Sequence, residues 1–380
     1  MIRKAIHQNK EARIIVTGCY AQSNYQDLKK IEGISLIAGN SEKNIILQQI
    51  NKLKINHTAI RVKPVKYLRE FDNIFKGETS LHTRAWVKIQ DGCNRFCSYC
   101  KVPYVRGPAR SRLIEDILRE IYDLDNRGIK EVVLLGINLG AYGEDLPNEN
   151  INLSKLISLI ADFKRIKRIR LSSIELVDLD DELLDTFVKY PKLCHHLHIP
   201  LQSGDDKILK LMNRPYNTSI FYKKICQIKK KISDIAITSD IMVGFPHEDN
   251  HSFNNTYNFV KKIGFAKMHI FPYSDREKCL ANLLPDKVDQ KITKERSKRL
   301  LDLSKELSYN FRKKYIGVIM NVLIENEIKD KEGKIYSQGI TDNYIKVLIP
   351  DLIGKKGELV KVQLNKACSD YMISKILLKI

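Results

Sequence analysis

The sequence predicts an α/β protein of three parts, and three observations support this prediction. From Trp86 to about Ser274, short apolar runs alternate with amphipathic helical patterns, which is typical of a parallel sheet whose strands are joined by helices. Before this region, one strand-like run leads into a helical pattern. After it, short strand-like runs are separated by turn residues. A chain of 380 residues is long enough for all three parts.

The central region contains six apolar runs. Between the first two runs, Ile114, Ile117, Ile121 and Leu124 recur at helical spacing, and Arg127-Gly128 gives a stop signal. Six strand-helix units favour a partial (β/α)6 barrel at residues 80–312, short of the full eight units. The runs are WVKI at 86–89, VVLLG at 132–136, IRLSSIE at 169–175, HLHIPL at 196–201, IAITSDIMVGF at 235–245 and MHIFPYS at 268–274.

The flanking regions predict two smaller domains. At 13–22, the run RIIVTGCYAQ reads as a strand, a tight turn at Gly18-Cys19 and the start of a helix, so residues 1–75 are an α/β fragment that ends in a linker within 50–80. A basic helical stretch at about 287–314 leads into residues 313–380. There VIMNVLIENEI, YIKVLI and GELVKVQL, with turns between them, predict a small β-barrel.

Composition narrows the class of protein. The chain has 65 Lys and Arg against 45 Asp and Glu, a formal charge of +20, which favours a polyanionic partner such as nucleic acid. No apolar run approaches the length needed to cross a bilayer, and the start does not resemble a signal peptide. We therefore expect a cytoplasmic protein whose eight cysteines do not form a disulfide framework.

Three of the cysteines lie close together in the run DGCNRFCSYCKVP. Cys93, Cys97 and Cys100 have C-x3-C-x2-C spacing and follow the first predicted strand. Thiolates select soft metals, and three of them without a fourth indicate an iron-sulfur cluster with one open iron. The alternative is a zinc site completed by a distant His or Cys.

Polar and glycine residues follow the other predicted strands. Because functional groups of such barrels lie at the carboxyl ends of the strands, we expect these residues on the same rim as the cysteines. Each also has a structural interpretation, as a turn residue or a helix cap. The segments are Gly136 to Asn138, Ser172 to Glu175, Pro200 to Gly204, Asp240 to Gly244, and Pro272-Tyr273.

The cysteine motif, with Tyr99 before its third cysteine, resembles that of the radical S-adenosylmethionine (SAM) superfamily. The longer runs KIQDGCNRFCSYCKVPYVRGPARSR, GINLGAYGEDL, LSSIE, HLHIPLQSGDDKILKLMNRPY, ITSDIMVGFPHE and HIFPYS resemble its methylthiotransferase branch. The RGPARSR segment and the Gln90-Asp91-Gly92 lead-in are most similar to the MtaB type, which acts on threonylcarbamoyladenosine in tRNA.

This resemblance implies an activity, cofactors and partners. The enzyme would add a methylthio group to C2 of N6-threonylcarbamoyladenosine next to the anticodon (position 37), using a [4Fe-4S] cluster on Cys93, Cys97 and Cys100 together with SAM. It also implies an electron donor of the flavodoxin or ferredoxin kind, no membrane, and a C-terminal RNA-binding TRAM domain. The residues implied to contact SAM are Tyr99, Gly136, Asn138, Ser173, Glu175, Gln202, Ser203, Arg214 and Asp240.

Cys19 departs from the family's pattern. Methylthiotransferases hold a second cluster on three cysteines of an N-terminal domain, and Cys19 matches only the last of these. We therefore expect an N-terminally truncated chain with a remnant of the second site and one cluster in place of two.

Other interpretations stay open. Within the branch, these are an enzyme acting on isopentenyladenosine in tRNA and one acting on a ribosomal protein. Outside the methylthiotransferase branch, the alternative is an RNA-binding protein with impaired catalysis. Of the three histidines at 195, 196 and 198, only His196 and His198 share a strand face, which favours packing or hydrogen bonding over a metal site. The scattered cysteines at 194, 226, 279 and 368 are interpreted as structural.

Overall fold

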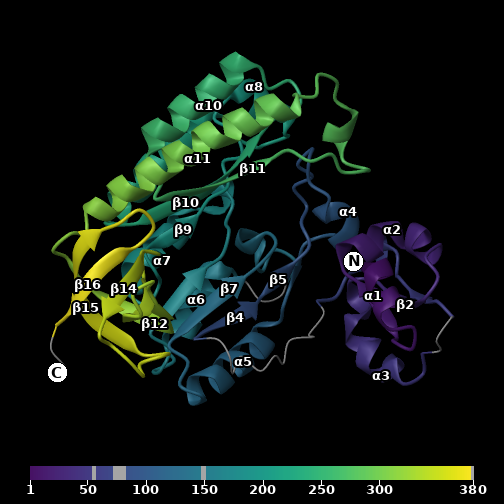
Figure 1. The fold of residues 1–380 in the computed structure, drawn as a ribbon, viewed down its shortest axis with the longest axis horizontal. Helices are drawn as coiled ribbons and strands as arrows, with labels where there is room; N and C mark the ends of the chain where they lie inside the picture. The colour runs from purple at the N-terminus through teal and green to yellow at the C-terminus, as the bar shows by residue number, and fades with distance from the viewer. Residues whose placement is uncertain (54–56, 72–82, 147–150, 378–380) are drawn as a thin grey trace.

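The computed structural model describes residues 1–53, 57–71, 83–146 and 151–377. Its described part divides into an N-terminal domain, a central α/β domain and a C-terminal barrel. The N-terminal domain lies beside α4 of the central domain, and the C-terminal barrel lies on the other side of the molecule (Figure 1). Part of the expected linker, together with the expected boundary at residues 75–80, lies outside the described residues.

The N-terminal domain is a three-stranded parallel sheet with order β1-β2-β3. Its elements are α1 (Ile2–Gln8), β1 (Ile14–Thr17), α2 (Cys19–Lys29), β2 (Ile34–Ala38), α3 (Ile46–Ile50) and β3 (Ala59–Arg61). The predicted strand, turn and helix at 13–22 are confirmed, with Gly18 at φ 100° in the turn. The interpretation of 50–80 as a linker is wrong at β3, where Ile60 pairs with Ile37 of β2. Three residues are too few to show a period, so only the partner strand reveals this one.

The central domain contains a strand in each of the six predicted runs. Its strands are β4 (Arg84–Lys88), β5 (Gln90–Asp91), β6 (Arg110–Ser111), β7 (Glu131–Leu135), β8 (Arg168–Leu171), β9 (His196–His198), β10 (Ala236–Val243) and β11 (Lys267–Pro272). Its helices are α4 (Val102–Arg106), α5 (Ile114–Asn126), α6 (Leu153–Ala161), α7 (Asp181–Lys189), α8 (Asp206–Leu211), α9 (Thr218–Lys231), α10 (Asn250–Ile263) and α11 (Gln290–Lys313).

The six main strands are parallel. They form two three-stranded sheets, β4-β7-β8 and β9-β10-β11. Single bridges, Ile169 to Leu193 and Ser173 to His198, connect the two sheets. All carboxyl ends of these strands therefore point the same way.

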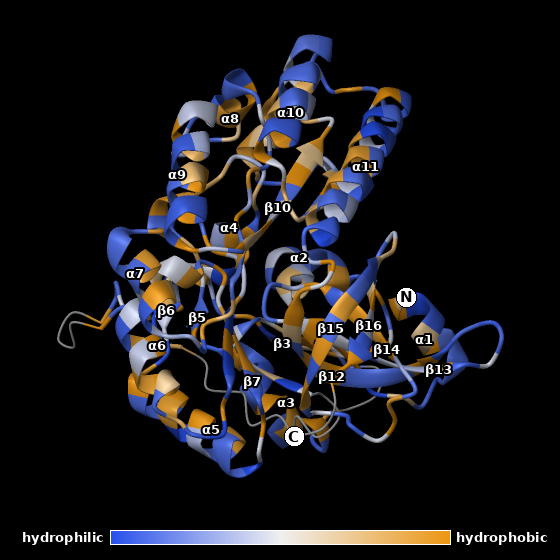
Figure 2. Ribbon diagram, turned by 90° about the vertical axis from the view of Figure 1, so that its left-hand side faces the viewer, coloured by the Kyte–Doolittle hydropathy of each residue, from blue (hydrophilic) through white to orange (hydrophobic). Residues whose placement is uncertain are grey.

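The helices bury one face each against this sheet. In α5, the predicted apolar residues Ile114, Ile117, Ile121 and Leu124 are all buried, and Gly128 follows the helix at φ 76°. The same residues belong to the largest hydrophobic core. Helices α10 and α11 carry both hydrophilic and hydrophobic residues, as amphipathic helices do (Figure 2).

The C-terminal domain is a closed barrel with strand order β12-β13-β14-β16-β15. Its strands are β12 (Ile319–Lys329), β13 (Ile335–Thr341), β14 (Lys346–Pro350), β15 (Leu359–Ala367) and β16 (Met372–Ile376). The sequence predicts β12, β14 and β15 but not β13 and β16. Polar residues such as Ser337 and Ser374 are buried in these two strands, and their hydroxyls donate to the carbonyl oxygens of Leu352 and Leu348. Burial of hydroxyls hides the alternation on which a strand prediction depends.

A buried charge cluster joins this barrel to the central domain. The Glu131 side chain is fully buried and pairs with Arg170 (Nε to Oε1, 2.7 Å) and Arg168 (Nη1 to Oε2, 3.5 Å). The same guanidinium groups donate to barrel carbonyl oxygens, at 2.6 Å to Asn321 and 2.8 Å to Asp342. Burial raises the pKa of Glu131, but Arg170 and Arg168 outweigh it, so the pKa lies below its ordinary value.

Among the described residues, no helix combines the length and the apolarity needed to span a bilayer.

Replacing Glu131 with Ala should lower the free energy of unfolding by about 3–5 kcal/mol, because it leaves the buried Arg168 and Arg170 without a counter-ion. Chemical denaturation followed by circular dichroism measures this change. The matched control is Asp302→Ala, which removes an exposed carboxylate paired with Lys305 and should cost about 0–1 kcal/mol. Equal losses in the two variants would contradict the prediction.

Candidate functional site

The three clustered cysteines lie on one loop between β5 and α4, beyond the carboxyl end of β4. Gly92 begins the loop at φ 75°, and a Cβ there would lie 1.9 Å from the Pro108 carbonyl oxygen. Only glycine fits this position. The loop is closed by hydrogen bonds from Cys93 N to Gly107 O (3.0 Å) and from Cys100 N to Cys97 O (2.9 Å).

The middle of the loop is fastened to distant parts of the chain. Ser98 donates through its backbone N to Met212 O (3.0 Å) and through Oγ to Leu211 O (2.8 Å). Its carbonyl oxygen accepts from Ala281 N (2.8 Å). Because Ser98 lies between the second and third cysteines, both thiols are held in fixed positions.

The thiols are a donor set for a soft metal. Burial raises the pKa of Cys100 to about 11, and the neighbouring thiols of Cys97 and Cys93 add to the rise. Burial also raises the pKa of Cys93. Ionisation of these grouped, sheltered thiols is therefore unfavourable until a metal replaces their protons. Three such thiols fit an iron-sulfur cluster that leaves one iron open.

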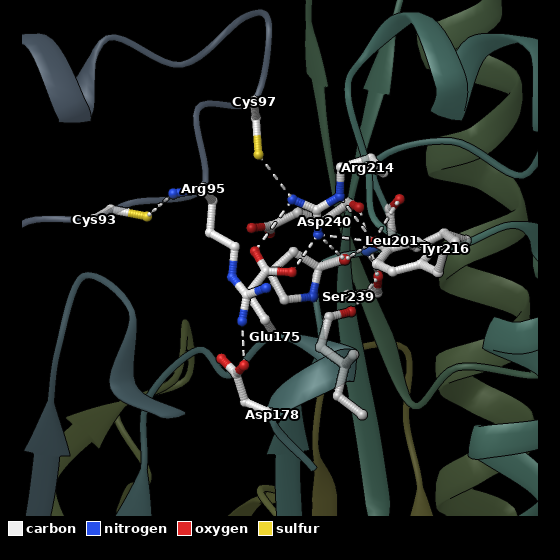
Figure 3. Close-up of polar contacts among 12 residues, drawn as sticks. Cys93, Arg95, Cys97, Glu175, Asp178, Leu201, Arg214, Tyr216, Ser239 and Asp240 are labelled. Carbon is white, nitrogen blue, oxygen red and sulfur yellow. Dashed lines mark hydrogen bonds and ion pairs between the residues drawn. The ribbon is translucent and has the colours of Figure 1, made fainter. Parts of the chain in front are cut away.

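Arg214 connects this loop to the strand ends (Figure 3). Its side chain is 1% exposed. The guanidinium donates through Nη1 to Cys97 Sγ (3.3 Å) and forms a two-point ion pair with Glu175, with Nη1 to Oε1 at 3.1 Å and Nη2 to Oε2 as the second contact. Nε donates to the Tyr216 hydroxyl (3.0 Å), which in turn donates to Pro200 O (2.8 Å). We call Arg214, Glu175, Tyr216 and Cys97 the arginine network.

Gln202 is strained and incompletely satisfied. Its φ is 71°, a region that costs a non-glycine residue free energy and often marks a ligand site. Its N donates to Asp240 O and its O accepts from Met242 N. The side-chain Oε1 is buried and has no hydrogen-bond partner among the described residues. A buried acceptor without a partner points to a ligand donor.

Asn138 and Gly136 lie at the end of β7. Asn138 N donates to Gln90 Oε1 (2.9 Å), while Asn138 Oδ1 is buried and also has no partner in the described part of the chain. A Cβ at Gly136 would lie 2.9 Å from Leu139 Cα. Gly136 therefore lets the chain turn closely here, and Asn138 offers an acceptor.

Asp240 lies between two imidazoles. Its Oδ2 is 3.2 Å from His198 Nε2, and its Oδ1 is 3.2 Å from His269 Nδ1. Burial raises the pKa of Asp240, but hydrogen bonds from His198 and His269 outweigh it and hold the pKa well below its ordinary value. His196 and His198 both contact Thr238 Oγ1, at 3.1 and 2.9 Å. The expected hydrogen-bonding role of these two histidines is thus observed.

The other residues that were expected to contact SAM differ in their exposure to solvent. Tyr99 is partly buried and its hydroxyl lies 3.5 Å from Arg214 Nη1; burial raises its pKa. Ser173 is exposed. The Ser203 hydroxyl is buried against Thr256 Oγ1 (3.2 Å), so it is already occupied within the protein.

Cys19 lies against α4, the helix that follows the cysteine loop. Its sulfur is 3.8 Å from Asn40 Nδ2, and Asn40 also donates to Val105 O (2.8 Å). Burial lowers the pKa of Arg106 of α4, but the charge of Asp91 and, after it, contact with Cys19 outweigh burial, so the pKa lies above its ordinary value. The N-terminal domain therefore directs one thiol to the side of the molecule that carries the three clustered cysteines. Of the scattered cysteines, Cys194 and Cys279 are buried, Cys226 is exposed, and Cys368 is intermediate.

Three participants were not among the expected site residues. Tyr216 positions Arg214, His269 faces Asp240, and Asp178 pairs with Arg95 of the cysteine loop. The sequence contained a signal for His269. Alternate residues of a strand share one face, and the register of the adjacent parallel strands β10 and β11 places His269 opposite Asp240. Asp178 and Tyr216 become neighbours of the site only through tertiary packing.

Comparisons with known proteins agree with this geometry. Residues 87–260 match the model of the Radical SAM superfamily. The chain is 37% identical to the threonylcarbamoyladenosine tRNA methylthiotransferase MtaB of Bacillus subtilis, covering 98% of this chain and 82% of the relative. It is 36% identical to the tRNA-2-methylthio-N(6)-dimethylallyladenosine synthase of Thermodesulfovibrio yellowstonii, covering 94% and 80%.

Among solved structures, the chain is similar to the cobalamin-dependent S-adenosylmethionine radical enzyme OxsB. The TM-score is 0.50 at 13% identity, covering 81% of this chain and 46% of that one. This similarity concerns the fold alone.

Replacing Asp240 with Asn should destabilise the protein at neutral pH by about 1.5–3 kcal/mol, the range for a hydrogen bond to a charged group. The pKa of Asp240 is lower in the folded state than its ordinary value of 3.8, so the carboxylate's contribution is present above that value and is lost as the pH falls. Denaturation of both proteins between about pH 6 and pH 3 should show the gap narrowing toward acid. A gap that widens toward acid would contradict this.

Proposed function

Because this chain belongs to the tRNA methylthiotransferases of the radical SAM superfamily, we propose that it modifies N6-threonylcarbamoyladenosine next to the anticodon. The enzyme replaces the hydrogen at C2 of that base with a methylthio group. The observation that carries this proposal is the 37% identity, over 98% of the chain, to a relative with that substrate in its name.

A second substrate is supported by a similar observation. A relative named for dimethylallyladenosine matches at 36% identity, so the apolar isopentenyl-type base is the alternative within the family. The products of the two reactions differ in mass, which makes the choice an experimental one.

The residues of the site fit an iron-sulfur cluster and SAM. Cys93, Cys97 and Cys100 would hold the cluster, because three grouped thiols are the donor set that leaves one iron open. When bound, the cluster and SAM supply a carbon-centred radical that removes a hydrogen atom from the substrate. Arg214 donates to Cys97 Sγ, and such hydrogen bonds stabilise the thiolate and tune the reduction potential.

The strand-end residues would hold SAM. Gln202 and Asn138 present buried acceptors without partners in the described chain, and Glu175 and Asp240 present carboxylates suited to an ammonium group or ribose hydroxyls. The remaining proposed contacts are Tyr99, Gly136, Ser173, Ser203 and Arg214. The Ser203 hydroxyl already forms a hydrogen bond with Thr256. We therefore expect Ser203 to contribute to SAM binding through the position of its backbone.

The six parallel strands would form the partial (β/α)6 barrel. In support, β4 and β11, the first and last of these strands, contribute Trp86 and His269 to one cavity, so the sheet curves until its edges face each other. The five-stranded C-terminal barrel would be a TRAM domain that binds RNA. Its Lys355, Lys356 and Lys361, with Lys366, are candidate phosphate contacts, and affinity for tRNA should fall steeply with added salt.

The proposed reaction needs one-electron reduction of the cluster, which a small flavodoxin-like or ferredoxin-like donor would supply. A tRNA substrate also implies action in the cytoplasm. Arg106, Asn40 and Cys19 lie together beside the cysteine loop, and we propose Cys19 as a remnant of a second cluster site. We expect one cluster in this chain, held by the three thiols of the cysteine loop.

Cys97→Ala should remove most of the bound iron from anaerobically reconstituted protein and abolish reductive cleavage of SAM, because the cluster loses one of its three ligands. Cys19→Ala is the matched control and should retain about four iron atoms per chain, the content of one cubane cluster. Iron analysis and chromatography of 5′-deoxyadenosine provide the two readouts. Loss of about half of the iron in Cys19→Ala would instead indicate a second cluster.

Expression of this chain in a bacterial strain lacking its own threonylcarbamoyladenosine methylthiotransferase should restore the methylthiolated nucleoside, as detected by mass spectrometry of digested tRNA. The Bacillus subtilis relative serves as the positive control and Cys97→Ala as the negative one. Return of the methylthiolated isopentenyl nucleoside alone, in a strain lacking that activity, would assign the alternative substrate.

A further inference from the structure

A cavity of about 370 Å³ lies inside the curve of the central sheet. It shares Ser173 and Asp240 with the proposed SAM contacts, and its other lining residues lie outside them. Its walls come from both edge strands, β4 and β11, and from β7 to β10 between them. Tyr344 of the C-terminal barrel also lines it, stacked on His196 with ring centroids 4.4 Å apart. The cavity thus has strand walls and a contact with the barrel.

Trp86 gives this cavity a flat aromatic wall. It is the chain's single tryptophan, on β4, and its side chain is 44% exposed while its neighbours Ala85 and Val87 are fully buried. Alternation along a strand therefore directs Ala85 and Val87 into the helix-covered core and Trp86 toward the cavity. Part of this aromatic residue is thus exposed beside the cavity, and aromatic side chains are the surfaces on which proteins stack nucleobases.

Most charges in the cavity are neutralised by neighbours, and Lys267 is the exception. Arg170 pairs with Glu131. Arg84 pairs with Glu325 at 2.7 Å. Asp240 is the single acidic residue among the lining residues, and both of its oxygens face imidazoles. Lys267, on β11, is exposed, and its side chain has neither a hydrogen bond nor an ion pair with any residue in the described part of the chain. Its ammonium group is available to a ligand.

Lys267 also lies where the cavity meets a second hollow. A groove of about 560 Å³ runs between α11 and the C-terminal barrel, and it shares Arg84, Thr238, Lys267 and Tyr344 with the cavity. Lys267 therefore lines both the groove beside the proposed RNA-binding barrel and the cavity that contains Trp86.

We propose that the cavity receives the target nucleobase and that Lys267 pairs with the carboxylate of its threonylcarbamoyl group. This inference rests on the proposed function and adds the residue that selects the substrate. The threonylcarbamoyl group carries a carboxylate, whereas the dimethylallyl group is a hydrocarbon. A carboxylate accepts a charge-assisted hydrogen bond from Lys267. A hydrocarbon in the same place displaces water from the ammonium group without offering it a new hydrogen bond, which is unfavourable.

The test uses the reconstituted holoenzyme and three anticodon stem-loop RNAs. They carry threonylcarbamoyladenosine, its carboxamide analogue without the negative charge, or dimethylallyladenosine at the target position. Fluorescence anisotropy gives the dissociation constants, and mass spectrometry gives kcat/KM for methylthiolation. The variant is Lys267→Met, which keeps the length of the side chain and removes its charge. The matched control is Lys223→Met, on the outer helix α9.

The wild-type protein and Lys223→Met should bind the acid at least about tenfold more tightly than the carboxamide, and Lys267→Met should lose this preference while binding the other two RNAs as before. Unchanged iron content and SAM cleavage in Lys267→Met would exclude a folding defect. An equal loss for all three RNAs would make Lys267 a phosphate contact and overturn the inference. A retained preference for the acid in Lys267→Met would also overturn it.

A different outcome of the same experiment would contradict the proposed function itself. In that case the wild-type enzyme methylthiolates the dimethylallyl RNA and not the threonylcarbamoyl RNA, and both the proposed substrate and the carboxylate contact are overturned. If the wild-type enzyme modifies the threonylcarbamoyl RNA without distinguishing acid from carboxamide, the proposed function stands and the inference about Lys267 fails.

Discussion

The two-point ion pair between Arg214 and Glu175 is the interaction on which the architecture of the site depends. A guanidinium with 1% exposure needs a fixed counter-charge, and Glu175 supplies it from the segment after β8. With this charge neutralised, the remaining donors of Arg214 reach Cys97 and Tyr216. The cysteine loop, the end of β8 and the segment before α9 are thereby held in one arrangement. Charge-assisted hydrogen bonds are directional, so they fix the orientation of the loop more closely than apolar packing alone would.

A second cluster of charges performs a similar task at the other end of the strands. Glu131 lies near the start of β7 and is surrounded by Arg168 and Arg170, whose spare donors reach carbonyl oxygens of the C-terminal barrel. The central domain and the barrel are therefore joined by directional bonds between groups that water does not reach. This junction also brings Tyr344 against His196, so the barrel contributes a wall of the cavity as well as a surface of its own.

Two departures from ordinary local structure lie just beyond the ends of strands in the central domain. Gln202 has a positive φ and a buried amide oxygen without a partner in the described chain, and Asn138 has a similar oxygen at the end of a neighbouring strand. Proteins tolerate such unfavourable features where a ligand compensates for them. The helix-covered side of the sheet, by contrast, consists of regular apolar packing. The unsatisfied oxygens of Gln202 and Asn138 thus lie where a cofactor would bind.

The sequence by itself determined the features that depend on local spacing. The six strand runs of the central domain, the helix from Ile114 and the turn at Gly18 follow from periodicity and from glycine, and the structure contains each of them. The three-cysteine donor set is likewise a matter of spacing on one loop. Polar residues at strand ends were expected on a common rim because parallel strands end together. Glu175 and Gln202 do follow the ends of β8 and β9, whereas Asp240 lies inside β10, which continues to Val243.

Only the tertiary structure decided which side chains pair across long separations. Arg214 was expected to touch a cofactor, yet its charge faces Glu175, 39 residues earlier in the chain. Strands β3, β13 and β16 are too short or too polar to be recognised without their partners. The pairing of His269 with Asp240 follows from the register of β10 and β11, whereas the approach of β4 to β11 around Trp86 and Lys267 arises from the curvature of the sheet. Curvature and side-chain pairing are properties of packed elements, and a local pattern of residues does not encode them.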